Sequence, residues 1–167
     1  MAEKVGFIGL GIMGGPMAEN LIEEEYELVL YNRTREKAEK LARAGAAVAD
    51  SPKEVAEKSD IIITMLPDSP QVEEVLAGED GVFEGVREGA LVVDMSTISP
   101  VVTRQLAERA AERGASMLDA PVSGGDVGAR QGTLSIMAGG GEEDFGRARP
   151  LFEVMGRTIT HVGPIGA

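Results

Sequence analysis

Residues 5–14 read VGFIGLGIMG, and this stretch decides the fold of the chain. The first four residues are apolar or glycine, which predicts a short buried strand. Downstream of the stretch, apolar side chains recur at helical spacing and predict a helix over residues 13–24. The chain therefore opens with a strand, a glycine-rich turn and a helix.

The glycines of this turn, Gly9, Gly11 and Gly14, have the spacing G-x-G-x-x-G. Each of them has a separate role: a tight turn, close approach of the backbone to a phosphate, and close packing of helix against strand. Free N–H groups and the positive end of the helix dipole then face one point. Between a strand and a helix, the motif predicts a binding site for the pyrophosphate of a dinucleotide.

The composition is typical of a soluble α/β domain. The chain has 167 residues, 43% of them hydrophobic, and a mean hydropathy of −0.02, which together predict one domain with its own core. No apolar run approaches the roughly 20 residues of a membrane span, and no secretory leader is evident. We therefore expect a cytoplasmic protein. The chain has no cysteine, which excludes disulfides, zinc–thiolate sites and thiol catalysis, and we expect no metal site.

The charge balance argues against two classes of partner. The 16 basic and 28 acidic residues give a formal net charge of −12. Nucleic acids and anionic membranes favour basic surfaces, so we expect neither as a partner. Local groups must hold an anionic cofactor against the field of the whole protein.

Strand-like and helix-like segments alternate along the chain. We expect strands at residues 5–8, 27–31, 46–49, 61–66, 90–94, 116–119, 134–138 and 158–162. We expect helices at residues 13–24, 34–44, 52–58, 70–77, 100–113 and 142–155. This alternation predicts an α/β fold of Rossmann type, with a doubly wound, mostly parallel sheet in a single domain of residues 1–167.

Particular residues in the sequence predict where helices begin and end. Ser51, Ser69 and Ser99 are each followed by proline, and we expect the serines to cap helices that begin at the prolines. Gly45 and Gly114 lie where a helix C-terminus favours a left-handed residue.

The end of the second expected strand indicates which dinucleotide is preferred. An acidic residue about 20 positions past the glycines would bind the ribose 2′-hydroxyl of NAD, but Asn32 and then Arg33 occupy this place. A guanidinium binds a 2′-phosphate that a carboxylate would repel. Arg35 and Lys37 add positive field, and Thr34 is expected to cap the next helix with its hydroxyl toward the phosphate. The pattern favours NADP(H) over NAD(H); the alternative is that the arginines only solvate a helix start.

Polar loops follow the fourth, fifth and sixth expected strands, at residues 66–68, 96–97 and 121–125. Ligands bind outside the carboxyl ends of parallel strands, so these loops are expected to border one crevice. Turn chemistry alone is the simpler interpretation, and it suits the Ser-Pro pairs. The segment Ser123-Gly124-Gly125 has little side-chain bulk, and we expect its hydroxyl and backbone N–H groups to bind a substrate carboxylate.

The combined motifs resemble the β-hydroxyacid dehydrogenase family. This family includes 3-hydroxyisobutyrate dehydrogenase, tartronate semialdehyde reductase and, more distantly, 6-phosphogluconate dehydrogenase. The resemblance covers the whole chain, and tartronate semialdehyde reductase looks nearest in local sequence. Its motifs are GFIGLGIMG at residues 6–14, ITMLP at 63–67, VDMST at 93–97 and DAPVSGG at 119–125.

The resemblance implies an NADP-linked oxidoreductase, with NAD also possible, that interconverts a 3-hydroxy acid and its semialdehyde by hydride transfer. It implies that the pyrophosphate contacts are Gly9, Leu10, Gly11, Ile12, Met13 and Gly14. At the 2′-phosphate it implies Asn32, Arg33 and Thr34. For the ribose and nicotinamide the implied residues are Met65, Leu66, Pro67 and Thr97. The substrate carboxylate is assigned to Ser123, Gly124 and Gly125.

The resemblance also implies a catalytic lysine a short distance beyond Ala167, so no catalytic residue is expected within the chain. A helical C-terminal domain, which in the family closes the active site and builds a homo-oligomer, is likewise expected to be absent. Carbonyl reduction needs a proton donor tuned near neutrality. The lysines of this chain lie far from the substrate loop, and His161 is expected to be structural. Two alternatives stay open: a stand-alone NADP-binding or redox-sensing module, and one half of a split enzyme.

Overall fold

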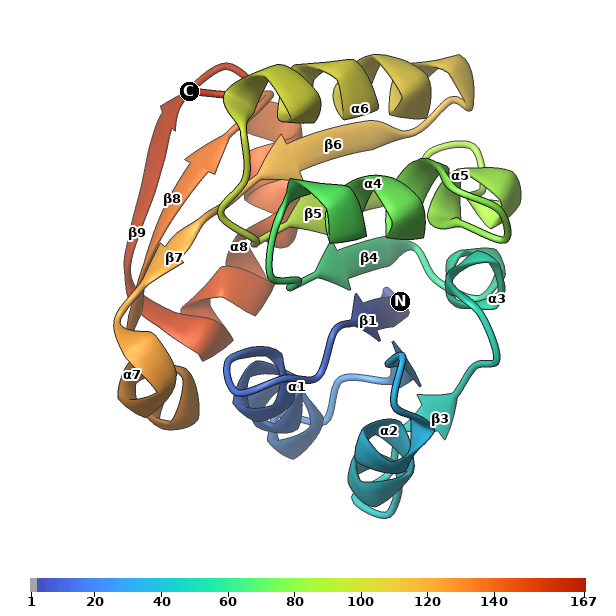
Figure 1. Ribbon diagram of the computed structural model, residues 1–167. Helices are drawn as coiled ribbons and strands as arrows, with labels where there is room; N and C mark the ends of the chain where they lie inside the picture. Colours follow the sequence, from blue (N-terminus) through green and yellow to red (C-terminus); the bar gives the residue numbers. More distant parts are fainter. Residues whose placement is uncertain (1–2) are drawn as a thin grey trace.

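Strand β1, Val5–Ile8, lies in the middle of the sheet, and all four of its residues are buried. The computed structural model describes residues 3–167 (Figure 1). In it, β1 pairs in parallel with β2, Leu28–Tyr31, on one side and with β4, Ile61–Thr64, on the other. Because a strand with two neighbours in a covered sheet has no solvent-facing side, a continuous apolar run is what this position requires.

Within residues 3–167 the sheet contains nine strands, in the order β3-β2-β1-β4-β5-β6-β8-β7, and β9 pairs with β8. The other strands are β3 Ala47–Val48, β5 Leu91–Asp94, β6 Ser116–Asp119, β7 Val122–Ser123, β8 Leu134–Gly139 and β9 Gly156–Gly163. Every pairing from β3 to β6 is parallel, whereas β8 is antiparallel to β6 and β7. The expected doubly wound, mostly parallel fold is confirmed, with its topological switch point between β1 and β4.

Two helical layers cover the sheet. One core joins the sheet to α1, α2, α7 and α8, and the other joins it to α3, α4, α5 and α6. Side chains of successive strand residues enter opposite cores: Phe7 the first and Ile8 the second. The helices are α1 Gly14–Glu23, α2 Arg35–Ala42, α3 Pro52–Glu57, α4 Ser69–Ala77, α5 Val82–Gly85, α6 Pro100–Glu112, α7 Gly125–Gln131 and α8 Glu142–Met155.

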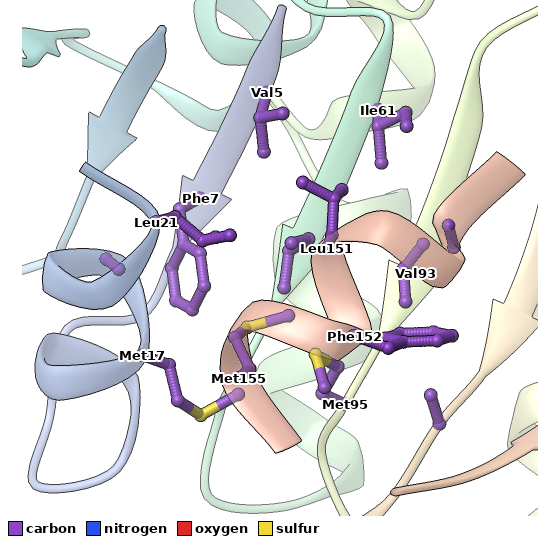
Figure 2. Close-up of a cluster of buried hydrophobic side chains, with 14 of the residues drawn as sticks. Val5, Phe7, Met17, Leu21, Ile61, Val93, Met95, Leu151, Phe152 and Met155 are labelled. Atoms are coloured by element: carbon purple, nitrogen blue, oxygen red, sulfur yellow. The ribbon is translucent and has the colours of Figure 1, made fainter. Parts of the chain in front are cut away.

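The first core lies between β1, α1 and α8. Figure 2 shows Phe7 of β1 beside Met17 of α1, with Met155 of α8 facing them and Phe152 of α8 on the far side of the cluster. All four side chains are at most 1% exposed. This packing holds α1 against the carboxyl end of β1, and so it positions the glycine turn between them.

Three short elements, namely β7, α5 and α7, have no counterpart among the elements expected from the sequence. Strand β7 has two residues and forms only because Val122 pairs with Ile136 and Ser123 with Ser135 of β8. Helix α7 has the sequence GDVGARQ, whose two glycines disfavour a helix. A hydrogen bond from Asn20 of α1 to the carbonyl of Ala129 stabilises it.

The capping predictions had mixed outcomes. Ser51 caps α3, since its Oγ accepts from the Glu54 N–H at 3.1 Å. Ser69 does not cap α4; Asp68 does, through a hydrogen bond at 2.7 Å from the Ser69 N–H. Ser99 stands at the N-cap of α6 without a side-chain bond. Gly114 has φ +75° after α6, as a left-handed C-terminus requires.

The helices within residues 3–167 are all too short or too polar to cross a membrane.

Candidate cofactor and substrate site

Sterics alone require glycine at two positions of the turn after β1. The Gly9 N–H donates to the Tyr31 carbonyl at 3.1 Å, and Gly9 has φ +101°. A Cβ at Gly9 would collide with the Met65 carbonyl oxygen, and a Cβ at Gly14 with the Gly9 carbonyl oxygen. The first glycine therefore makes the turn, and the third allows α1 to pack closely on it.

Gly11 differs from the other two glycines. A Cβ at this exposed residue would meet nothing within 4 Å. Protein packing therefore does not explain the glycine, whereas a ligand lying close to the backbone would. The adjacent end of α1 also suits an anion, because its N-cap Met13 makes no side-chain capping bond and its first turn has no acidic residue. These residues fit a bound diphosphate.

The end of β2 lies directly beside this turn. Asn32 Oδ1 accepts from the Leu10 N–H at 2.8 Å, and its Nδ2 donates to the Thr34 carbonyl at 2.9 Å. Arg33 is exposed and belongs to none of the ion pairs found among residues 3–167. Its guanidinium is therefore not neutralised by a neighbouring carboxylate.

Two expectations at this turn need correction. Arg35 is paired with Asp50 and, at 3.9 Å, with Glu39, so it adds less free positive field than predicted. Thr34 does stand at the N-cap of α2, but its side chain makes no capping bond. The exposed hydroxyl of Thr34 is not used by the helix.

A buried polar network supports the loops after β4 and β5. Asp94 Oδ1 accepts from the Thr64 hydroxyl at 2.9 Å and from the Ser96 N–H at 3.1 Å. Ser96 Oγ in turn accepts from the Leu66 N–H at 2.8 Å. Met65 and Leu66 are half-buried, while Pro67 and Thr97 are exposed at the same edge of the sheet. The network fixes the backbone from which these four predicted cofactor residues project.

Asp94 itself is fully buried, and its Oδ2 has no hydrogen-bond partner within residues 3–167. Burial raises its pKa from 3.8 to about 6, although the hydrogen bonds from Ser96 and Thr64 act in the opposite direction. Asp94 is not among the site residues expected from the sequence. The feature that could have indicated it is a carboxylate at the end of the apolar strand LVVD.

The predicted substrate residues follow β6 at the neighbouring position along the sheet edge. Ser123 is exposed on β7, and Gly124 and Gly125 turn the chain into α7 with φ of +138° and +64°. A Cβ at Gly125 would meet nothing within 4 Å. Helix α7 packs beside α1, to which Asn20 ties it (Figure 1). Parallel β1, β4, β5 and β6 thus bring the predicted cofactor and substrate loops to one edge.

His161 has a structural environment, as expected. Its Nε2 lies 2.6 Å from the Gly140 carbonyl oxygen, and its ring stacks on Phe145 with centroids 4.9 Å apart. The five lysines lie on or beside α2, α3 and the start of β1, and none belongs to the substrate segment.

This strand order, with a glycine turn and an uncapped helix N-terminus at the switch point, defines a dinucleotide-binding domain. Residues 4–163 match the family model described as the NAD binding domain of 6-phosphogluconate dehydrogenase. The chain belongs to this family.

Curated relatives with known names support this membership. The chain is 51% identical over 163 residues to 2-hydroxy-3-oxopropionate reductase of Escherichia coli, covering 98% of the chain and 56% of that protein. It is 46% identical over 165 residues to the probable mitochondrial 3-hydroxyisobutyrate dehydrogenase of Dictyostelium discoideum, covering 99% and 51%. The chain thus spans about half the length of the curated relatives it matches.

Solved structures show the same fold. Mycobacterium tuberculosis 3-hydroxyisobutyrate dehydrogenase with L-serine has a TM-score of 0.93 and 38% identity, covering 100% of this chain and 56% of that one. Psf3 in complex with NADP+ has a TM-score of 0.92 and 36% identity, covering 97% and 57%. An imine reductase variant from Myxococcus stipitatus in complex with NAD+ has a TM-score of 0.88 and 26% identity, covering 99% and 56%. Both cofactors therefore occur among the neighbours.

The buried carboxyl of Asp94 makes stability depend on pH. Its pKa is raised from 3.8 to about 6 in the folded chain, so the folded state binds the proton more tightly. This contribution to stability is complete below the unfolded pKa and is lost as the pH rises through the folded pKa, by roughly 3 kcal/mol in all. Asp94→Asn keeps the Oδ1 acceptor but cannot ionise, so it does not lose this stability as the pH rises. The free energy of unfolding of the variant should therefore increase relative to that of the wild type between pH 4 and pH 7.5.

Urea unfolding at both pH values measures this difference. Glu36→Gln, an exposed change on α2, controls for the loss of one negative charge. A stability difference between Asp94→Asn and the wild type that is the same at both pH values would contradict the prediction.

Proposed function

We propose that this chain binds NADP(H) as the dinucleotide-binding part of an oxidoreductase. The proposed reaction is the interconversion of a 3-hydroxy acid and its semialdehyde, of the 3-hydroxyisobutyrate or tartronate semialdehyde type. The observation that carries the cofactor proposal is the open space around Gly11, beside a helix N-terminus without a side-chain cap. The substrate class follows from the names of the relatives that match nearly the whole chain.

Several groups are proposed to hold the cofactor. The pyrophosphate lies along the glycine turn of residues 9–14, with Arg33 and the Thr34 hydroxyl at the 2′-phosphate. Asn32, which the resemblance also places at the 2′-phosphate, uses its amide for the bonds to Leu10 and Thr34. Arg33 supports the preference for NADP(H), because it is exposed and lies in none of the ion pairs of residues 3–167. Residues 65–67 and Thr97 line the ribose and nicotinamide, on the backbone that the Asp94 network supports.

When bound, the nicotinamide supplies or accepts the hydride. The chain's own residues contribute binding and orientation. Ser123, with the backbone N–H groups of Gly124 and Gly125, is proposed to hold the substrate carboxylate, since all three residues are exposed and the two glycines turn the chain, and turns of this kind bind anions. No residue of the chain is assigned as the proton donor, because His161 is engaged with Gly140 and Phe145. We assign that role to a lysine beyond residue 167, as the family resemblance implies.

The role of Gly11 can be separated from folding. Gly11→Val places a side chain in open space at a position without positive φ, so the free energy of unfolding should be almost unchanged. The same side chain occupies the space proposed for the pyrophosphate, so NADPH affinity should fall at least tenfold, or about 1.4 kcal/mol. Calorimetric titration with NADPH and urea unfolding give the two readouts. Unchanged affinity in a folded variant would remove Gly11 from the site.

Cofactor preference depends on Arg33. Wild-type chain should bind NADPH more tightly than NADH, and Arg33→Asp should erase or reverse this preference, since a charge-assisted hydrogen bond contributes roughly 1.5–3 kcal/mol. Arg43→Asp makes the same charge change at the other, exposed end of α2 and should leave the preference in place. Equal affinities of the wild-type chain for both cofactors, measured by titration calorimetry, would count against the NADP(H) assignment.

The 167-residue chain should bind NADP(H) without turning over 3-hydroxy acids or their semialdehydes. General acid–base catalysis contributes typically 10²–10⁴-fold, and we assign no donor within the chain. The test is a steady-state assay of the pure chain with NADPH and each semialdehyde. Turnover within tenfold of a full-length relative would place the donor inside the chain. Turnover that appears only after a second protein is added would favour the split-enzyme alternative.

A further inference from the structure

The Asn32 side chain joins two loops that lie 22 residues apart. Its Oδ1 accepts from the Leu10 N–H at 2.8 Å, inside the glycine turn. Its Nδ2 donates to the Thr34 carbonyl at 2.9 Å, inside the turn that carries Arg33. The preceding residue, Tyr31, accepts from the Gly9 N–H through its backbone carbonyl. Tyr31 at the end of β2 and Asn32 directly after it therefore bind two consecutive N–H groups of the glycine turn.

Only a carboxamide provides both bonds at this position. A carboxylate of the same length accepts from an N–H group but cannot donate to a carbonyl, and alanine does neither. Leu10 is 4% exposed, so water does not readily replace the lost acceptor, and an unsatisfied buried N–H is costly. The bridge is thus specific to the residue type as well as to the position.

The two bonds fix two different ligand-facing segments. The first directs the Leu10 N–H toward β2, which sets the path of the backbone into Gly11. The second sets the Thr34 carbonyl at the N-cap of α2, and with it the path of the exposed Arg33. Without the bridge, each segment has to find its ligand-bound geometry separately.

We propose that Asn32 is a positioning residue that holds the glycine turn and the Arg33–Thr34 turn in one geometry, so that the pyrophosphate and the 2′-phosphate of an NADP-type dinucleotide meet both turns together. This inference rests on the proposed function of the chain. The Asn32 amide acts through the two turns that it joins. Its removal lowers the fraction of molecules that are ready to bind, and apparent affinity falls with that fraction.

The test uses the whole chain with the substitutions Asn32→Ala and Asn32→Asp. The first readout is hydrogen exchange of the Leu10 amide in ligand-free protein, followed by NMR. The amide should be protected in the wild type and in Asn32→Asp, which retains an acceptor, and unprotected in Asn32→Ala. The second readout is the dissociation constant of NADPH and of NADH, measured by calorimetry.

The affinities should separate the two bonds. Asn32→Ala should weaken NADPH and NADH alike, by roughly tenfold for the loss of both bonds. Asn32→Asp should weaken NADPH at least as much, because it loses the Thr34 bond and adds negative charge near Arg33. It should not weaken NADH by more than about threefold, because the Leu10 bond persists and a carboxylate at this place can also bind the ribose 2′-hydroxyl of NADH. Ser51→Ala, which removes a side-chain acceptor from the Glu54 N–H, controls for destabilisation and should change neither affinity.

Two outcomes would overturn the inference. One is equal exchange of the Leu10 amide in the wild type and in folded Asn32→Ala. The other is wild-type NADPH affinity in Asn32→Ala with only its unfolding midpoint lowered, which is the result of a purely structural bond. If Asn32→Ala does not fold, an unprotected Leu10 amide or strongly weakened NADH binding in Asn32→Asp contradicts the inference. A wild-type chain that binds neither dinucleotide refutes the proposed function instead, and the exchange experiment still tests the bridge.

Discussion

The close contact of Gly14 with the Gly9 carbonyl is the constraint on which the rest of the structure depends. No side chain fits at either position, so α1 begins directly on the end of β1 and buries Met17 and Leu21 against the sheet. The helix N-terminus then lies at the switch point between β1 and β4. Open space at Gly11 is a consequence of this geometry, and so is the proposed phosphate site.

The proposed anion site consists of local groups within an acidic chain of net charge −12. The first turn of α1 has no acidic residue, while Arg35 of α2 is already paired with Asp50 and Glu39. Arg33 has no such partner among the ion pairs of residues 3–167. The dipole of α1 and the guanidinium of Arg33 attract an anion at short range. Salt screens the repulsion from the more distant acidic residues.

The antiparallel part of the sheet supports the predicted substrate segment. β8 holds β7 through two residue pairs, and Asn20 holds the end of α7 against the same helix that begins at the glycine turn. The predicted cofactor and substrate segments therefore share α1 as a common support. A shift of α1 would move both segments together, which joins packing in the first core to the geometry of the site.

The sequence by itself determined the strand–glycine turn–helix unit, the alternation of strands and helices, the Ser51 cap and the edge at which the candidate residues meet. The first three features depend on neighbours within a few residues, where propensity and periodicity act. The shared edge follows from the general rule that ligands bind outside the carboxyl ends of parallel strands. Tertiary structure decided the rest. Strand β7 and helix α7 exist through contacts with β8 and α1, the Asn32 amide bridges residues that are distant in sequence, and Asp94 acquires its raised pKa by burial. Long-range hydrogen bonds and desolvation have no local signal, because both arise only when the sheet brings separate segments together.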